Sequence, residues 1–191
     1  MTHGPWLLAA GLVGAYLLRG SRTLAKLDAK VLSTIKARLE SKGAAWLGQT
    51  EQSAKVRALI TDYATAWQWA EAPDFDQGAP DWCGIWAMEV IREALGLPPW
   101  PTMLYQAPLP LHPWGRWYGS VGDIIKVAEG KGFEVQSPAP GDLYSIGTTH
   151  VGLVRSVEDN RIVTFDANWS NEVGSRTTGT ADKRFWRWLQ T

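Results

Sequence analysis

The stretch that decides the fold is residues 143–168, which read LYSIGTTHVGLVRSVEDNRIVTFDAN. It contains runs of β-branched and apolar residues at 143–146, 151–157 and 161–165, and such runs are typical of strands. The polar residues 158–160, EDN, predict a hairpin turn between the last two runs. Because strands joined by so short a turn pair antiparallel, the sequence predicts an antiparallel β-sheet in the C-terminal half.

The part of the chain before these strands is expected to be helical. Apolar residues recur at steps of three and four over residues 21–42 and 51–70. A further helix is expected to begin at Cys83 and to stop at Gly96, since prolines follow directly, and a short one is expected over 119–130. Helices first and strands later predict an α+β fold.

Composition excludes some classes of function. The 191 residues are enough for one domain with a real core and an appendage. A formal net charge of zero gives no electrostatic case for a nucleic-acid partner. A single cysteine allows no intramolecular disulfide, and no cluster of His, Cys and Asp suggests a metal site. We therefore expect no metal and no cofactor.

The N-terminal region differs in character from the rest. Residues 1–20 are short and apolar and form a candidate membrane anchor, with membrane contact through residues 4–18. Trp6 and Tyr16 lie near the two ends of that run, as aromatic residues at a membrane interface do. A helix packed on protein and an uncleaved or atypical signal are the alternatives. Residues 21–48 are expected to form an amphipathic helical stalk, with an ordinary packed helix as the alternative.

Cys83 lies where a reactive thiol would be useful. Asp81 is expected to cap the helix that follows it. A thiol in the first turn lies at the positive end of the helix dipole, which favours the thiolate, and the backbone N–H groups there can stabilise an oxyanion. Gly84 is expected to leave room for a substrate backbone. The alternative is that Cys83 is a buried structural cysteine.

A histidine and two polar residues downstream can complete a catalytic site. His150 opens a strand that must be mostly buried, whereas His3 lies in the apolar tail and His112 in a proline-rich loop, so His150 is the best base available. Asp166 and Asn168 are two residues apart and point to one face if the strand continues. Either could accept a hydrogen bond from the ring and fix its tautomer. The alternative is that both residues serve only a turn.

These residues resemble the CHAP and NlpC/P60 group of papain-like cell-wall hydrolases, and the CHAP pattern fits best. The likeness covers roughly residues 70–191 and lies in 81–83 (DWC), 140–143 (PGDL), 150–154 (HVGLV) and 166–168 (DAN). It implies a papain-like domain over residues 49–191 with Cys83 as nucleophile and His150 as base. It also implies that Asp166 and Asn168 orient the histidine. Asp166 departs from the pattern, since CHAP members usually carry glutamate there.

The resemblance also implies a substrate. The expected partner is bacterial peptidoglycan, cleaved at an amide bond by an N-acetylmuramoyl-L-alanine amidase or a peptide endopeptidase. The chain has 12 tryptophans, whose rings can stack on sugars or wall a peptide cleft. For each tryptophan singly, a place in the core is the alternative. The expected substrate-binding residues are Trp82, Gly84, Trp114, Trp117 and Trp169.

Two other functions remain open from the sequence. The same thiol chemistry would serve a papain-like toxin or deamidase that acts on a protein. A non-catalytic wall-binding domain or a structural membrane protein would leave Cys83 without a chemical role. For the hydrolase, the apolar N-terminus and the absence of a standard signal peptide favour a membrane-associated protein of a phage virion or of the bacterial envelope.

Overall fold

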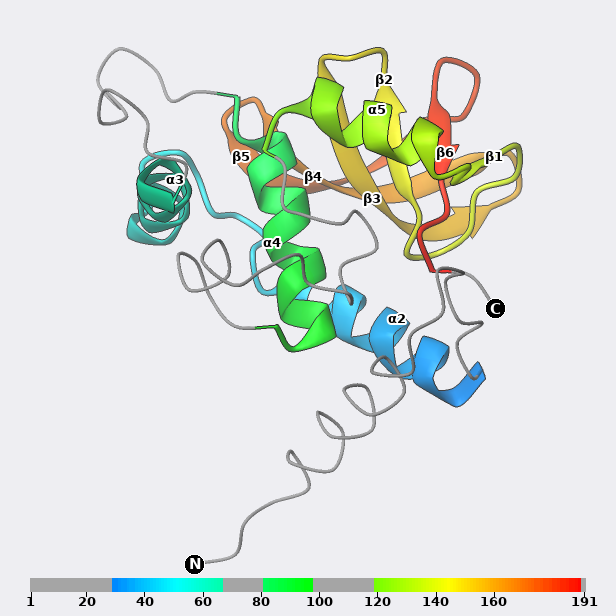
Figure 1. Cartoon of the computed structure of the whole chain (residues 1–191), viewed down its shortest axis with the longest axis horizontal. Coiled ribbons are helices and arrows are strands. Elements are labelled where there is room, and N and C mark those ends of the chain that lie inside the picture. Colours follow the sequence, from blue (N-terminus) through cyan, green and yellow to red (C-terminus); the bar gives the residue numbers. More distant parts are fainter. Residues whose placement is uncertain (1–28, 67–80, 98–118, 190–191) are drawn as a thin grey trace, which may run out of the picture.

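The computed structural model describes residues 29–66, 81–97 and 119–189, and the predicted α+β class is confirmed there (Figure 1). The helices precede the strands along the chain. They are α2 (Ala29–Ala44), α3 (Ala54–Ala66), α4 (Cys83–Leu95) and α5 (Val121–Gly130). The strands are β1 (Glu134–Val135), β2 (Leu143–Ile146), β3 (His150–Glu158), β4 (Arg161–Trp169), β5 (Glu172–Gly179) and β6 (Arg184–Trp186).

The strands form one six-stranded sheet in the order β1-β6-β2-β3-β4-β5. Every neighbouring pair is antiparallel, as predicted from the hairpin pattern. The three predicted strands are present as β2, β3 and β4, and the turn between β3 and β4 places Asp159 at a φ of 53°. Strand β5 was not predicted because its sequence, EVGSRTTG, is mostly polar and buries only Val173.

Helix α4 lies at the centre of the molecule (Figure 1). Almost every residue from Cys83 to Ala94 is buried, because the helix packs against α2, α3, α5 and one face of the sheet. Gly96 ends it in the left-handed conformation, with a φ of 68°, as predicted. The other face of the sheet carries a smaller apolar cluster of Tyr144, Val154, Ile162 and Phe185. The sheet therefore has one face covered by helices and a second face with little apolar cover from the described chain.

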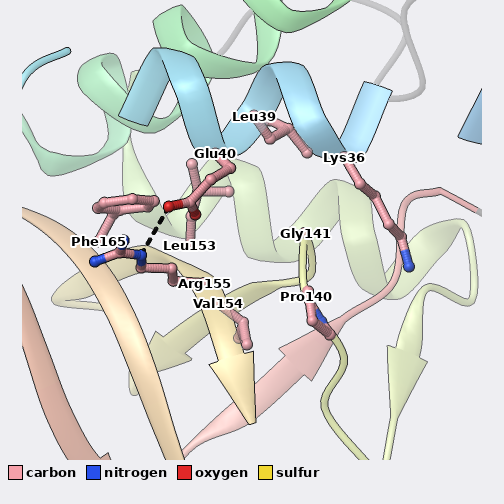
Figure 2. A pocket seen from close by; sticks show the side chains of 9 residues that line it. All are labelled: Lys36, Leu39, Glu40, Pro140, Gly141, Leu153, Val154, Arg155 and Phe165. Carbon is pink, nitrogen blue, oxygen red and sulfur yellow. Dashed lines mark hydrogen bonds and ion pairs between the residues drawn. The ribbon is translucent and has the colours of Figure 1, made fainter. Parts of the chain in front are cut away.

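Helix α2 packs onto the edge of this core (Figure 2). Leu39 is buried, and a Cβ added at Gly43 would lie 2.8 Å from the ring of Phe165, so the helix and the sheet are in close contact. At the exposed border, Arg155 Nε donates to Glu40 Oε1 at 2.8 Å. The cavity left in this seam has a volume of about 30 Å³, room for about one or two water molecules.

The predicted stalk over residues 21–48 differs from the structure. Its described part is a helix of the domain itself, and its apolar stripe faces α4 because Ile35 and Leu39 belong to the main core. Residues 1–20, with the predicted membrane contact at 4–18, lie outside the described residues. In the ranges that are described, no helix is both long and apolar enough to cross a bilayer.

Candidate active site

The N-terminus of α4 presents Cys83 at an uncapped helix end. Trp82 is the N-cap residue, with φ −105° and ψ 4°, and no side chain caps the helix. The prediction that Asp81 is the cap is wrong, because its Oδ1 atom accepts a hydrogen bond from Asn168 Nδ2 at 3.3 Å. The first N–H groups of a helix have no partner within the helix. Those beside the sulfur are therefore placed to receive an oxyanion.

His150 connects the thiol to a carboxylate. As the first residue of β3, it places ring atom Nε2 2.9 Å from Asp166 Oδ1, and its ring also hydrogen bonds to the Cys83 side chain. Because Nε2 is engaged by Asp166, Nδ1 is the nitrogen left for the sulfur. Cys83 is 2% exposed, His150 9% and Asp166 1%, so the three groups lie in surroundings where water screens their charges poorly.

The environment of His150 favours its protonated form. Burial is the largest influence and lowers the pKa, but hydrogen bonds to Asp166 and Cys83 and the charges of both residues act against it and raise the pKa to about 9. The ring therefore keeps its proton at neutral pH. A cationic imidazole beside a sulfur stabilises the thiolate, which is the form of cysteine that attacks carbonyl carbon.

Asp166 is held from the opposite side by two residues that sequence reasoning missed. The Tyr144 hydroxyl donates to its Oδ1 and the Thr164 hydroxyl to its Oδ2. Burial, and then the charge of Asp166, raise the pKa of Tyr144, so its hydroxyl remains a donor. These two donors, with the His150 ring, fix the carboxylate on the face of the sheet opposite α4.

Gly152 makes this arrangement sterically feasible. In the sheet register it lies directly between Tyr144 on β2 and Asp166 on β4. A Cβ at this position would lie 2.6 Å from Asp166 Oδ1 and 2.6 Å from a Tyr144 ring carbon. The missing side chain lets the tyrosine reach across β3 to the carboxylate. A glycine inside a strand often marks such a close approach, and this was the available sequence signal.

Gly152→Ala is therefore expected to weaken both the fold and the site. The added methyl group has to displace Asp166 or Tyr144, and overpacking of this kind costs roughly 1–3 kcal/mol. The free energy of unfolding, measured in urea, checks the first effect, and the alkylation rate of Cys83 checks the second. Gly179→Ala is the matched control, because nothing lies within 4 Å of a Cβ there. Equal stability of the two variants would contradict the role given to Gly152.

Asn168 departs from its predicted position. The pairing between β4 and β5 shifts register between Asp166 and Trp169, and Asn168 has a φ of 60°. Strand alternation is lost at this bulge, so the two side chains do not share a face. Asp166 faces His150, whereas the Asn168 amide donates to Asp81. Asn168 thus joins the end of β4 to the residues just before α4 and is not the ring acceptor.

The residues predicted to bind substrate divide into different environments. Trp169 is 40% exposed, and its ring meets the His150 ring edge-on with 5.1 Å between centroids, so it can wall a substrate cleft. The prediction for Trp82 is wrong, because that side chain is completely buried in the core. The space expected beside Gly84 is filled by the carbonyl oxygen of Gly119. Trp114 and Trp117 lie outside the described residues.

Comparison of the chain with protein-family models, with curated proteins and with solved structures finds no match. Across the described ranges, no group of three or more His, Cys, Asp or Glu side chains is arranged to hold a metal ion. The site is thus defined by its own geometry: a thiol at a helix N-terminus, an imidazole and a buried carboxylate. That order of groups is suited to nucleophilic chemistry on a carbonyl carbon.

Proposed function

We propose that this protein is a cysteine hydrolase with a papain-like domain, and that it cleaves an amide bond of peptidoglycan. One observation carries the hydrolase: Cys83 at an uncapped helix N-terminus hydrogen bonds to His150, which hydrogen bonds to the buried Asp166. The substrate is supported by the resemblance of residues 81–83, 140–143, 150–154 and 166–168 to CHAP and NlpC/P60 hydrolases.

The geometry supports a two-stage reaction. The Cys83 thiolate attacks the carbonyl carbon of the amide, and the first backbone N–H groups of α4 stabilise the oxyanion that forms. Protonated His150 gives its proton to the leaving amine, the C–N bond breaks, and a thioester remains. Neutral His150 then takes a proton from water, which attacks the thioester and releases the carboxylic acid. The proton stays on His150, and the thiolate is restored beside the cationic ring.

Asp166 serves both stages without itself reacting. It accepts from Nε2 and so directs Nδ1 to the sulfur side of the ring, and its negative charge stabilises the cationic ring. Tyr144 and Thr164 satisfy its remaining lone pairs, which keeps the carboxylate oriented when the ring is neutral. Trp169 lies against the ring from the exposed side and limits the approach of water.

The proposal is tested by digestion of purified peptidoglycan with the wild-type protein and with Cys83→Ala. Wild type is expected to clear the wall in a zymogram, and the variant is not. Matching thermal melts establish that the variant is folded. Mass spectrometry of the soluble products identifies the cleaved bond: a free lactyl carboxylate indicates an amidase, and a new N-terminus within the stem or cross-bridge indicates an endopeptidase.

The other outcomes separate the alternatives. Equal clearing by wild type and Cys83→Ala would sink the thiol mechanism. An intact wall together with rapid alkylation of Cys83 would direct the search to a protein substrate, as in a toxin or deamidase. An intact wall with a thiol no more reactive than an ordinary free cysteine would leave a non-catalytic domain. Because Cys83 is only 2% exposed, a small reagent such as iodoacetamide is needed.

A further inference from the structure

A cavity of about 270 Å³ lies beside the catalytic carboxylate, on the sheet face away from α4. It is bounded by β2, β4 and β5 and by the segment that leads into β6. The proposed catalytic steps use Asp166 from this lining, and Trp169, which also lines the cavity, meets the His150 ring edge-on. Its lining residues are Tyr144, Asp166, Trp169, Arg176, Thr177, Thr178 and Lys183.

Arg176 contributes a guanidinium group that is only partly satisfied. Its Nη2 atom donates to the backbone oxygen of Trp169 at 2.9 Å, and its charged carbon lies 5.3 Å from the centre of the Trp169 ring. Its Nε atom is buried and has no hydrogen-bond partner in the described part of the chain. A buried N–H of a charged group without an acceptor is costly, and an acceptor that enters the cavity would remove this cost.

Lys183 adds a second cation to the same wall. Its side chain is only 4% exposed, and its ion-pair partner Asp182, at 2.6 Å, is 66% exposed. A lysine that is buried to this extent with one surface partner retains donor capacity toward the cavity. Among the described residues, Asp166 is the only lining carboxylate, and it is already engaged by His150, Tyr144 and Thr164. With the cationic His150 ring offsetting Asp166, the cavity has an excess of positive charge.

We propose that this cavity binds a carboxylate group of the substrate and so selects peptides that carry a free acid close to the scissile amide. The proposal rests on the hydrolase function and specifies its substrate. A guanidinium N–H edge with a nearby ammonium group is the arrangement that recognises carboxylates. Thr177 and Thr178 of β5 complete this part of the lining. Peptidoglycan stems exist with carboxylate or with carboxamide at corresponding positions, so the cavity would distinguish these two chemical forms.

The test uses two synthetic muropeptides that are identical except for a carboxylate or a carboxamide at one stem position. Wild type is expected to cleave the acid form with a kcat/KM about 10- to 100-fold higher, the range of a charge-assisted hydrogen bond. Arg176→Gln is expected to remove most of this preference, and Lys183→Met part of it. Arg155→Gln is the matched control, because Arg155 pairs with Glu40 of α2 and is not among the lining residues, so its loss should leave the preference unchanged.

Each outcome bears on one proposal. If wild type cleaves both forms at the same rate, the carboxylate cavity is refuted and the hydrolase stands. If Arg176→Gln slows both forms equally, Arg176 serves only to position Trp169, and the cavity proposal fails. If wild type cleaves neither form nor whole peptidoglycan, the hydrolase fails. The cavity is then judged in Cys83→Ala protein by the NMR signal of the Arg176 Nε–H: a shift with the acid muropeptide alone supports it, and no shift overturns it.

Discussion

His150→Ala is expected to lower kcat on soluble peptidoglycan fragments by about 10⁴-fold, the order seen when the base of a nucleophile–base pair is removed. In the proposed mechanism, the ring supplies the proton for the leaving amine and the positive charge that stabilises the thiolate. Its loss removes both, while the helix N-terminus that stabilises the oxyanion remains. Release of new amino groups under saturating substrate measures the effect.

Two further measurements distinguish this chemical loss from a structural one. Alkylation of Cys83 by iodoacetamide at pH 7 should slow in His150→Ala, because the thiolate loses the cationic neighbour that stabilises it. Thr149→Ala, at the exposed residue just before His150, is the control and should retain wild-type kcat. A His150→Ala protein that alkylates at the wild-type rate would contradict the ion pair.

Asp166→Asn is expected to lower kcat by about 10³- to 10⁴-fold and to change the pH profile. The amide keeps the shape of the carboxylate but not its charge, so the ring loses the partner that stabilises its cation. Burial, which lowers the pKa of His150, then has less to oppose it. In wild type, kcat/KM should fall on the alkaline side near pH 9, where His150 loses its proton. In the variant this alkaline limit should move to lower pH.

The raised pKa of His150 in wild type also makes the free energy of unfolding depend on pH. The pKa of His150 is raised from 6.5 to about 9, so the folded state holds this proton more tightly than the unfolded chain. The resulting stabilisation is complete below pH 6.5 and is lost as pH rises through 9, and its upper bound is about 3 kcal/mol. Urea unfolding of wild type at the two pH values measures it, and Asp166→Asn should show a smaller difference.

A variant with an intermediate effect tests whether the carboxylate of Asp166 is the cause of the loss of activity in Asp166→Asn. Tyr144→Phe removes one donor from the carboxylate but leaves its charge, so its kcat should lie between those of wild type and Asp166→Asn. If kcat/KM of Asp166→Asn falls at the same alkaline pH as that of wild type, the carboxylate does not control the pKa of the His150 ring. Thermal melts of both variants establish that they are folded.

The sequence allowed prediction of those parts of the fold that depend on local pattern. Helix α4, the strands β2 to β4 and the turn at Asp159 follow from periodicity and turn residues, so they were found. Gly152 and Tyr144 were missed because their role depends on which residues face each other across three strands. That register is set by the assembled sheet. The orientation of Asn168 could not be foreseen either, because strand alternation predicts it only in the absence of a bulge.

Burial explains why the structure differs from the predictions made for Trp82 and Gly84. Trp82 immediately precedes Cys83, so a substrate contact was expected, but proximity along the chain does not determine which side chain faces the core. Gly84 was read as space for a substrate, whereas another part of the chain occupies that space. Both residues therefore support the position of Cys83 from inside the protein. Trp169, at the exposed end of β4, is the tryptophan of the described chain that lies beside His150.

The bulge in β4 has a consequence for changes of chain length. It allows residues within one short segment to face three partners, with Asp166 toward the imidazole, Asn168 toward Asp81 and Trp169 across the ring. Deletion of one residue between Asp166 and Trp169 would restore regular pleating, leave the indole on the face of Asp166, and break the contact between Asn168 and Asp81. Insertions at the β3–β4 turn, by contrast, would leave this geometry intact. The site is thus sensitive to the spacing of residues at one end of a hairpin and tolerant of it at the other.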